Sequence, residues 1–443
     1  MTKPKTIYDI FKTKGQPTLT YVKREKGHFE EILEAALESK GTLCLLTGPS
    51  KTGKTSLFTR VAEELGLEIL KVRCDKSVTP TEFWKRALEE INFDRLESIE
   101  KGKGKELVVG VALEGKIGWS WLLASLTGKA NLSRNTTETE IESRNRILAD
   151  PAPSHLIPVL RQLPILLVVE DFHYLSPDTQ ETIFQQWKVF VDNEVSVVVV
   201  GTTHHAADLA YANKDLVGRI SHVDLPKWQI ADLEKILNMG FGYLKITIQN
   251  NLKRLIAEES AGLPIITQAI CRQMLIRKSI KEVSNIDTAT QFNDHDVRAA
   301  LHDVALLEYN QFSSLYDNLI RGPRKRARLY DTYELILSTF TLDPLSFSLS
   351  RDELDGRLKK LPLPEEKRPP AASLNATLAA LGRFQDRIGF SLLEWIPKHR
   401  RLFIVEPSFL FYLRWRESRA PKSKTDELRD LLNKLLGIKD SSI

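Results

Sequence analysis

The chain has 443 residues, of which 42% are hydrophobic, 27% charged and 8% aromatic, a balance typical of a globular protein with about three domains. This composition excludes disordered, collagen-like and low-complexity chains, and three widely separated cysteines exclude a disulfide framework or a zinc site made by cysteines alone. No apolar run is long enough to span a bilayer and the N-terminus has no apolar stretch that could serve as a secretory signal, so we expect a cytoplasmic protein with no membrane contact.

The first half alternates strand-like and helix-like segments, which is the pattern of a parallel sheet covered by helices. Helices are predicted at 27–39, 54–65, 80–91, 137–149, 154–162 and 177–192, and strands at 42–48, 67–74, 164–169 and 195–201. The glycine-punctuated apolar stretch 106–130 predicts a hairpin-like insertion. Its Trp119 and Trp121 mark either an assembly contact or buried packing.

From about residue 229 the strands stop, and helices are predicted at 229–239, 249–260, 263–279 and 297–320, with a polar bridge at 284–296. Three short helices at 329–341, 350–360 and 372–388 precede a two-stranded hairpin at 390–396 and 402–405. The predicted organisation is an N-terminal segment 1–20, an α/β domain 21–228, a helical lid 229–283, a helical linker 284–328, a C-terminal domain 329–420 and a helical tail 421–443.

A phosphate-binding loop is the strongest motif in the sequence. Residues 48–55, GPSKTGKT, fit G-x-x-x-x-G-K-[ST] fully, after an apolar strand and before a helical pattern. We expect backbone N–H groups to wrap the phosphates, Lys54 to reach the β- and γ-phosphates, and the Thr55 hydroxyl to bind Mg²⁺. The alternative is an accidental glycine-rich turn. The predicted nucleotide contacts are Gly48, Pro49, Ser50, Lys51, Thr52, Gly53, Lys54, Thr55 and Ser56.

A pair of carboxylates, Glu170 and Asp171, ends the buried run ILLVVED. Ligand-facing groups lie at the carboxyl ends of strands in open parallel sheets, so this pair is predicted to hold Mg²⁺ and to polarise an attacking water. By position Glu170 faces the metal and Asp171 the water, although the two roles could be exchanged. The alternative is that both residues simply mark a strand end, and His173 beside them is predicted to be structural.

Two further positions are predicted near the reaction, each with an alternative. Thr202 or Thr203, after the strand at 195–201, either senses the γ-phosphate or caps a loop. Arg219, just before a strand-like run, either stabilises transition-state charge on the nucleotide of a neighbouring subunit or forms a surface ion pair.

Together these motifs resemble the AAA+ superfamily, and within it the STAND and origin-recognition-type ATPases, over roughly 18–280 and 329–416. Tyr21-Val22-Lys23-Arg24 is similar to the short N-terminal element that packs near adenine, so Tyr21 and Val22 are implied contacts. Gly262-Leu263-Pro264 matches the GxP motif, whose proline, here Pro264, lies near the base and ribose in family members.

The resemblance implies an α/β P-loop fold with a helical lid and a C-terminal winged helix. It also implies a switch in which ADP holds a closed monomer, ATP with Mg²⁺ at the 48–55 loop drives homo-oligomer assembly, and slow hydrolysis resets the system. STAND proteins usually carry an N-terminal effector and a C-terminal repeat sensor, and we expect neither here, because only about 20 residues of the sequence precede the ATPase core and no repeats follow it. A separate effector or sensor protein is therefore expected, and the resemblance implies a setting in bacterial conflict or defence.

Positive charge is concentrated at the end of the chain, because residues 311–443 carry a net charge of +7 and the first 310 carry −2. This charge is either a polyanion contact or a solvated basic face. In a DNA-binding winged helix the third helix enters the major groove and the wing contacts the backbone. The alternative is a winged helix that serves only as a hinge. The candidate duplex-DNA contacts are Arg321, Arg324, Lys325, Arg326, Arg328, Arg383, Arg387, Lys398, Arg400 and Arg401.

Three hypotheses follow. The first is a nucleotide-dependent switch that assembles, with Arg219 reaching across, and regulates a separate protein. The second is a DNA-associated AAA+ ATPase that loads or regulates replication or transposition proteins. The third, a pseudo-ATPase, is disfavoured because Lys54, Thr55, Glu170 and Asp171 are all present.

Overall fold

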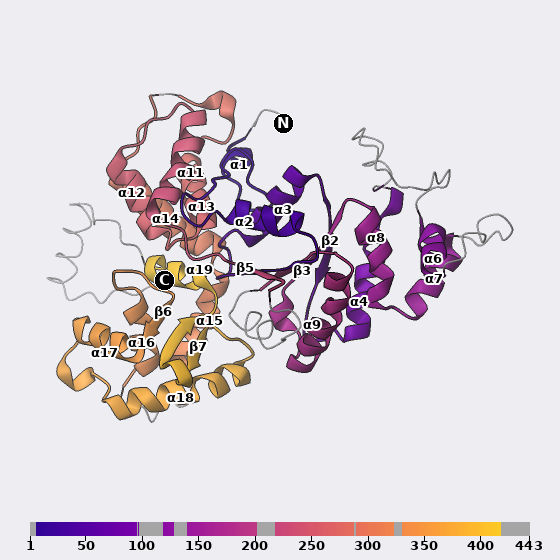
Figure 1. The fold of residues 1–443 in the computed structure, drawn as a ribbon. Coiled ribbons are helices and arrows are strands. Elements are labelled where there is room, and N and C mark those ends of the chain that lie inside the picture. The colour runs from indigo at the N-terminus through magenta and orange to yellow at the C-terminus, as the bar shows by residue number, and fades with distance from the viewer. Residues whose placement is uncertain are drawn as a thin grey trace. The chain divides into compact units, whose positions relative to one another are not determined.

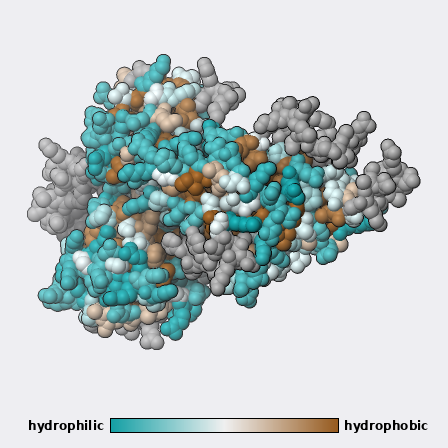
Figure 2. Space-filling view, in the orientation of Figure 1, coloured by the Kyte–Doolittle hydropathy of each residue, from teal (hydrophilic) through white to brown (hydrophobic). Residues whose placement is uncertain are grey.

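The computed structural model describes residues 6–94, 96, 118–127, 140–201, 218–287, 289–322 and 330–417, which fall into two compact units (Figure 1). Lys23–Lys227 forms the α/β unit, and Met1–Val22 with Trp228–Ile443 forms the helical unit. Within the described ranges no helix is long and apolar enough to cross a membrane. Figure 2 shows that hydrophilic side chains cover most of the visible face, as expected when apolar side chains are buried.

A five-stranded parallel sheet forms the centre of the α/β unit, and its strand order is β2-β3-β4-β1-β5. The strands are β1 (Leu43–Thr47), β2 (Glu68–Arg73), β3 (Ile165–Glu170), β4 (Val197–Val200) and β5 (Ile220–Asp224). Every residue of β1, β3 and β4 is buried, which explains why these segments are continuous apolar runs rather than alternating ones. The predicted strands are therefore confirmed.

Helices cover both faces of this sheet (Figure 1). On one face the core contains residues of α2 (Phe29–Glu38) and α3 (Lys54–Leu65), and on the other, residues of α4 (Pro80–Glu89), α8 (Ile157–Gln162) and α9 (Pro177–Asp192). Strand β1 divides its side chains between these cores, with Cys44 in the first and Leu45 in the second. The helix 154–162 predicted from sequence is split into a 3-10 turn, Pro153–Leu156, and α8.

The hairpin-like structure predicted for 106–130 is wrong where the structure describes this segment. Trp119–Thr127 forms helix α6, which packs on α7 (Glu140–Ala149); the rest of 106–130 lies outside the described residues. The segment lacks the alternation of a strand, and its Ser125 hydroxyl bonds to the carbonyl four residues earlier, as in a helix. Trp119 packs edge-on against Phe93, with 5.4 Å between ring centroids, so it takes part in core packing.

The helical unit begins with a short helix, α1 (Ile7–Ile10), and continues after residue 228. Its next helices are α11 (Ile230–Tyr243), α12 (Asn250–Glu259), α13 (Pro264–Arg277), α14 (Asp294–Glu308) and α15 (Gln311–Arg321). The single helix predicted at 297–320 is thus two helices. The break lies at Tyr309, which is buried with Phe312, so tertiary packing overrides a continuous helical pattern.

The last described part of the chain combines three helices, a small sheet and a final helix. These elements are α16 (Thr332–Phe340), β6 (Ser348–Ser350), α17 (Arg351–Lys360), α18 (Ala371–Ile388), β7 (Leu393–Ile396), β8 (Arg401–Ile404) and α19 (Pro407–Trp415). The sheet is antiparallel with the order β6-β8-β7, so the predicted hairpin of β7 and β8 is confirmed and β6 is an additional strand.

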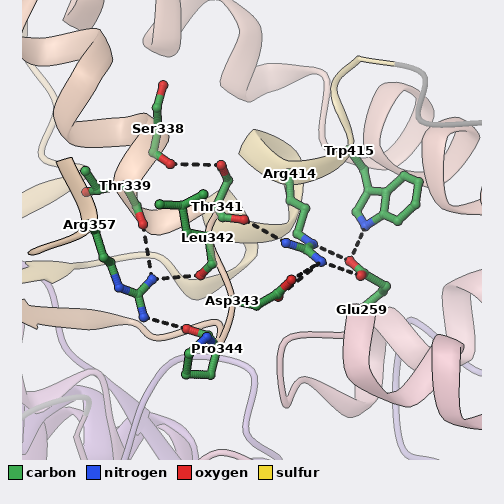
Figure 3. Close-up of polar contacts among 10 residues, drawn as sticks. All are labelled: Glu259, Ser338, Thr339, Thr341, Leu342, Asp343, Pro344, Arg357, Arg414 and Trp415. Atoms are coloured by element: carbon green, nitrogen blue, oxygen red, sulfur yellow. Dashed lines mark hydrogen bonds and ion pairs between the residues drawn. The ribbon is translucent and has the colours of Figure 1, made fainter. Parts of the chain in front are cut away.

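One hydrophobic core joins the predicted lid to the C-terminal segment, because it contains residues of α1, α13, α14, α16, α18 and α19. A buried polar cluster links the same parts (Figure 3). Glu259, the last residue of α12, accepts hydrogen bonds from the Arg414 guanidinium, with Nη2 to Oε1 at 2.6 Å, and from Trp415 Nε1 at 2.8 Å. The segments predicted as separate lid, linker and C-terminal domain therefore pack here as one compact unit.

Candidate functional site

The loop between β1 and α3 requires glycine at its two ends. Gly48 has a φ of +132°, and a Cβ added there would lie 2.2 Å from the Leu225 carbonyl oxygen. Gly53 has a φ of +98° and directly precedes α3. Side chains would strain or block both positions, so the glycines of the motif allow the loop to turn closely against the end of β5.

Lys54, the first residue of α3, is only 8% exposed, and its side chain reaches back into this loop. Its Nζ donates to the carbonyl oxygens of Gly48 at 2.8 Å and Pro49 at 2.7 Å. The loop thus curves around a positive charge, and the N-terminus of α3 adds the positive end of a helix dipole. This combination is suited to bind the phosphates of a nucleotide.

A hydroxyl and a carboxylate meet beside the loop. Thr55, the second residue of α3, donates its Oγ1 hydrogen to Glu170 Oε1 at 3.2 Å, where Glu170 ends β3 and is 9% exposed. Hydroxyl and carboxylate oxygens are the ligands that Mg²⁺ prefers, and Mg²⁺ is bound through few protein ligands together with phosphates. The chemistry of Thr55 and Glu170 therefore fits a magnesium–nucleotide complex.

Asp171 follows Glu170 at the carboxyl end of β3 and has a φ of +61°. Its charge also acts on Cys74, where burial first and Asp171 second raise the pKa of the thiol to about 12. Burial lowers the pKa of His173. The negative charge of Asp171 partly offsets this shift, and the positive charge of Lys54 adds to it. His173 Nδ1 is buried, and it has no hydrogen-bond partner among the described residues.

Three cations near the site were not predicted as site residues. Arg24 donates to the Thr52 carbonyl of the loop at 2.5 Å and to the Pro226 carbonyl at 2.9 Å. Lys71 Nζ and Arg73 Nε lie 3.4 and 3.5 Å from Glu170 Oε2. A signal for the last two was present, because two cations two residues apart in a strand face the same side.

Arg219 lies at the amino ends of the parallel strands, whereas the phosphate loop of its own chain lies at their carboxyl ends. Its carbonyl accepts a hydrogen bond from Leu43, the first residue of β1, whereas the loop follows Thr47, the last. These two residues of β1 are four positions apart, which corresponds to about 13 Å along the strand. The exposed guanidinium of Arg219 pairs with Asp192 at 3.3 Å.

The remaining predicted residues are distributed over the chain. Tyr21, Val22 and Pro264 belong to the helical unit, where Val22 packs with α11 and α12 and Pro264 is the first residue of α13. Thr202 and Thr203 lie outside the described residues. Four members of the predicted basic run also lie outside them: Arg324, Lys325, Arg326 and Arg328.

The other predicted DNA contacts lie in the helical unit. Arg321 is the last residue of α15. Arg383 and Arg387 are exposed on α18, one turn apart, and Lys398 is exposed between β7 and β8. The neighbouring cations have acidic partners, because Arg400 pairs with Asp352 and Arg401 with Glu353, both at 3.6 Å.

Comparison with known proteins gives one family and several solved structures. A family model described as an AAA domain matches residues 37–209. Among curated proteins none matches the chain. The Walker-type ATPase PABY2304 of Pyrococcus abyssi is 16% identical, with a TM-score of 0.49, over 90% of this chain and 100% of that one.

Two further solved structures have lower TM-scores. CDC6P from Pyrobaculum aerophilum is 13% identical, with a TM-score of 0.42, over 93% of this chain and 99% of that one. The Aeropyrum pernix ORC1 protein, in complex with DNA, is 14% identical, with a TM-score of 0.42, over 97% of this chain and 100% of that one.

The strand order, the loop after β1 and the family match identify the fold of the α/β unit. The α/β unit has the fold of a P-loop ATPase of the AAA+ type. The predicted fold class is therefore confirmed for this unit, and the nucleotide site at residues 48–56 stays a prediction.

Proposed function

We propose that the protein is an ATP-binding and slowly hydrolysing molecular switch of the STAND type, which assembles into a homo-oligomer on nucleotide exchange and regulates a separate partner protein. The observation that carries this proposal is the contact of Thr55 with Glu170 beside a complete phosphate loop. It joins a hydroxyl on α3 to a carboxylate on β3, the two groups that such a site needs for Mg²⁺.

Each residue of the site has a proposed role. Lys54 exchanges the carbonyls of Gly48 and Pro49 for phosphate oxygens when a nucleotide binds. Thr55 and Glu170 hold Mg²⁺, which supplies neutralisation of phosphate charge when it is bound. Asp171 accepts a proton from the attacking water, since it directly follows Glu170 at the carboxyl end of β3.

Arg219 is proposed to act on the nucleotide of a neighbouring subunit. Arg219 lies at the amino ends of the strands, about 13 Å along β1 from the phosphate loop of its own subunit, so a role at the nucleotide of that subunit is unfavourable. Because its guanidinium is exposed and, among the described residues, is paired with the exposed Asp192, exchange to an incoming phosphate costs little. Hydrolysis would then depend on assembly.

The helical unit is proposed to provide the moving part of the switch. We assign α16–α18 with the β7–β8 hairpin to a winged helix and α11–α13 to the lid, in which Pro264 contacts the base and ribose, with Tyr21 and Val22 near the adenine. In this role the winged helix is a hinge element, which the pairing of Arg400 with Asp352 supports. A role in bacterial conflict or defence would fit such a switch.

A DNA-associated ATPase is the second candidate, favoured by one observation. Arg383 and Arg387 are exposed on α18, the helix that enters the major groove in DNA-binding winged helices. On this proposal Lys398, Arg400 and Arg401 contact the phosphate backbone, together with the basic run that begins at Arg321. Their contacts would be lost steeply as salt rises.

The ATP hydrolysis rate, measured with and without duplex DNA, tests both candidates, with Lys54→Ala as the blank. A slow rate that is unaffected by DNA supports the switch. A rate that DNA raises several-fold, and that falls as salt rises, supports the DNA-associated ATPase instead. A wild-type rate equal to that of Lys54→Ala would contradict the proposed ATPase activity.

A further inference from the structure

Two cations on β2 hold the oxygen of Glu170 that faces away from Thr55. Strands β2 and β3 pair so that Arg73 lies opposite Glu170, and Lys71 lies two residues earlier on the same face. Lys71 Nζ is 3.4 Å and Arg73 Nε 3.5 Å from Glu170 Oε2, whereas Thr55 bonds to Oε1. One oxygen of the Glu170 carboxylate therefore contacts Thr55 beside the phosphate loop, and the other contacts two positive charges.

Lys71 is the stronger of the two partners. Its side chain is 30% exposed beside a Glu170 side chain that is 12% exposed, whereas the Arg73 side chain is 74% exposed. Charges interact more strongly when they are partly removed from water, and exposed pairs contribute little. The Lys71 ammonium also lies 5.3 Å from the centroid of the ring of Phe58, a residue of α3, and this cation–π contact helps to fix the position of the ammonium.

From this arrangement we propose that Lys71, assisted by Arg73, sets how strongly nucleotide binding depends on Mg²⁺. Lys71 is a positioning residue: it neutralises part of the charge of Glu170 and keeps Oε2 turned toward β2. The inference rests on the proposed function, because it assigns Glu170 to the metal. It deepens that function, since a weakened hold on Mg²⁺ lets the site keep a nucleotide while hydrolysis stays slow.

The coupling ratio between Mg²⁺ and nucleotide measures this effect directly. It is the dissociation constant of a fluorescent ATP analogue in EDTA divided by the same constant in saturating Mg²⁺. A purely structural role of Lys71 would weaken binding in both conditions and leave the ratio unchanged. Loss of a nearby positive charge instead raises the ratio, because a more negative Glu170 attracts Mg²⁺ more strongly.

The test compares the full-length wild type with Lys71→Met, which removes the charge and keeps the length of the chain. Lys76→Met, at an exposed position further along the chain, removes the same charge and serves as the matched control. We expect the coupling ratio to rise about fivefold or more in Lys71→Met, to rise less in Arg73→Gln, and to stay unchanged in Lys76→Met. An unchanged or lower ratio in Lys71→Met overturns the inference.

A double variant identifies Glu170 as the intermediary. In a Glu170→Gln background, Lys71→Met should no longer change the coupling ratio, because the charge through which it acts is gone. An equal rise in both backgrounds overturns the inference. A wild type that binds the analogue in neither condition contradicts the proposed function and this inference together, whereas normal binding with an unchanged ratio in Lys71→Met contradicts the inference alone.

Discussion

Replacing Glu259 by alanine would leave the Arg414 guanidinium and the Trp415 indole N–H without their shared acceptor (Figure 3). The side chains of Glu259 and Arg414 are each only 10% exposed. Burial on its own lowers the pKa of Arg414, but the hydrogen bonds and charges of Glu259 and Asp343 together more than offset this, so that the pKa is raised. Because an arginine guanidinium keeps its proton even when it is buried, Arg414 stays charged when Glu259 is removed.

Breaking a buried ion pair by deleting one partner typically costs about 3–5 kcal/mol. Arg414 keeps a hydrogen bond to the Thr341 carbonyl at 2.7 Å and an ion pair with Asp343 at 3.2 Å, which places the expected loss for Glu259→Ala near the lower end, about 3 kcal/mol. The Asp343 side chain is 73% exposed, so Asp343→Asn, the matched control, should cost less than about 1 kcal/mol.

Native-state hydrogen exchange of the amides in α12 and α19 measures this loss locally. For Glu259→Ala we expect their exchange to accelerate about 100-fold, while amides of the central sheet in the α/β unit keep their wild-type rates. The double variant Glu259→Leu/Arg414→Met should be less destabilised than Glu259→Ala, because no buried charge is left unpaired. Equal exchange in Glu259→Ala and Asp343→Asn would refute this reasoning.

Three further predictions concern the α/β unit and the cysteines. Gly48→Ala should weaken nucleotide binding by an order of magnitude or more in a titration with a fluorescent ATP analogue, because its Cβ meets the Leu225 carbonyl; unchanged affinity would show that the loop can relax. Asp171→Asn should keep that affinity and lose turnover in a phosphate-release assay; if Asp171→Asn abolishes the Mg²⁺ dependence while Glu170→Gln spares binding, the two acidic roles are reversed. Iodoacetamide at about pH 8.5 should label no cysteine of the folded protein within an hour, but all three in denaturant. Burial raises the pKa of each thiol, to about 12 at Cys44 and Cys74, and the reactive thiolate forms only as the pH approaches the pKa. If mass spectrometry detects labelled cysteines in the folded protein, the burial of the thiols is contradicted.

Local patterns explain which parts of the fold could be predicted. The phosphate loop, its flanking strand and α3 depend on neighbouring residues in the sequence, and the prediction of 54–65 for the helix agrees with Lys54–Leu65 in the structure. The acidic end of β3 was visible for the same reason. Glycines in 106–130 suggested turns, but the packing of α6 on α7 decided the outcome for Trp119–Thr127.

Contacts between distant segments could not be predicted from local patterns. The pairing of Lys71 with Glu170 depends on β2 and β3 being neighbours in register, which the alternation of charges in β2 does not reveal by itself. Likewise Glu259 and Arg414 are far apart in sequence, and each alone resembles a charged residue near the end of a surface helix. Their burial follows from the core that α12–α14 share with α16 and α19.

Sedimentation velocity with ATP or ADP, each with Mg²⁺, tests the central proposal most directly, because it asks whether the site at residues 48–56 controls assembly. We expect the wild type to sediment as a larger species with ATP than with ADP, and Lys54→Ala to remain monomeric with both. Identical sedimentation of the wild type with ATP and ADP, or ATP-dependent assembly of Lys54→Ala, would contradict the proposed switch.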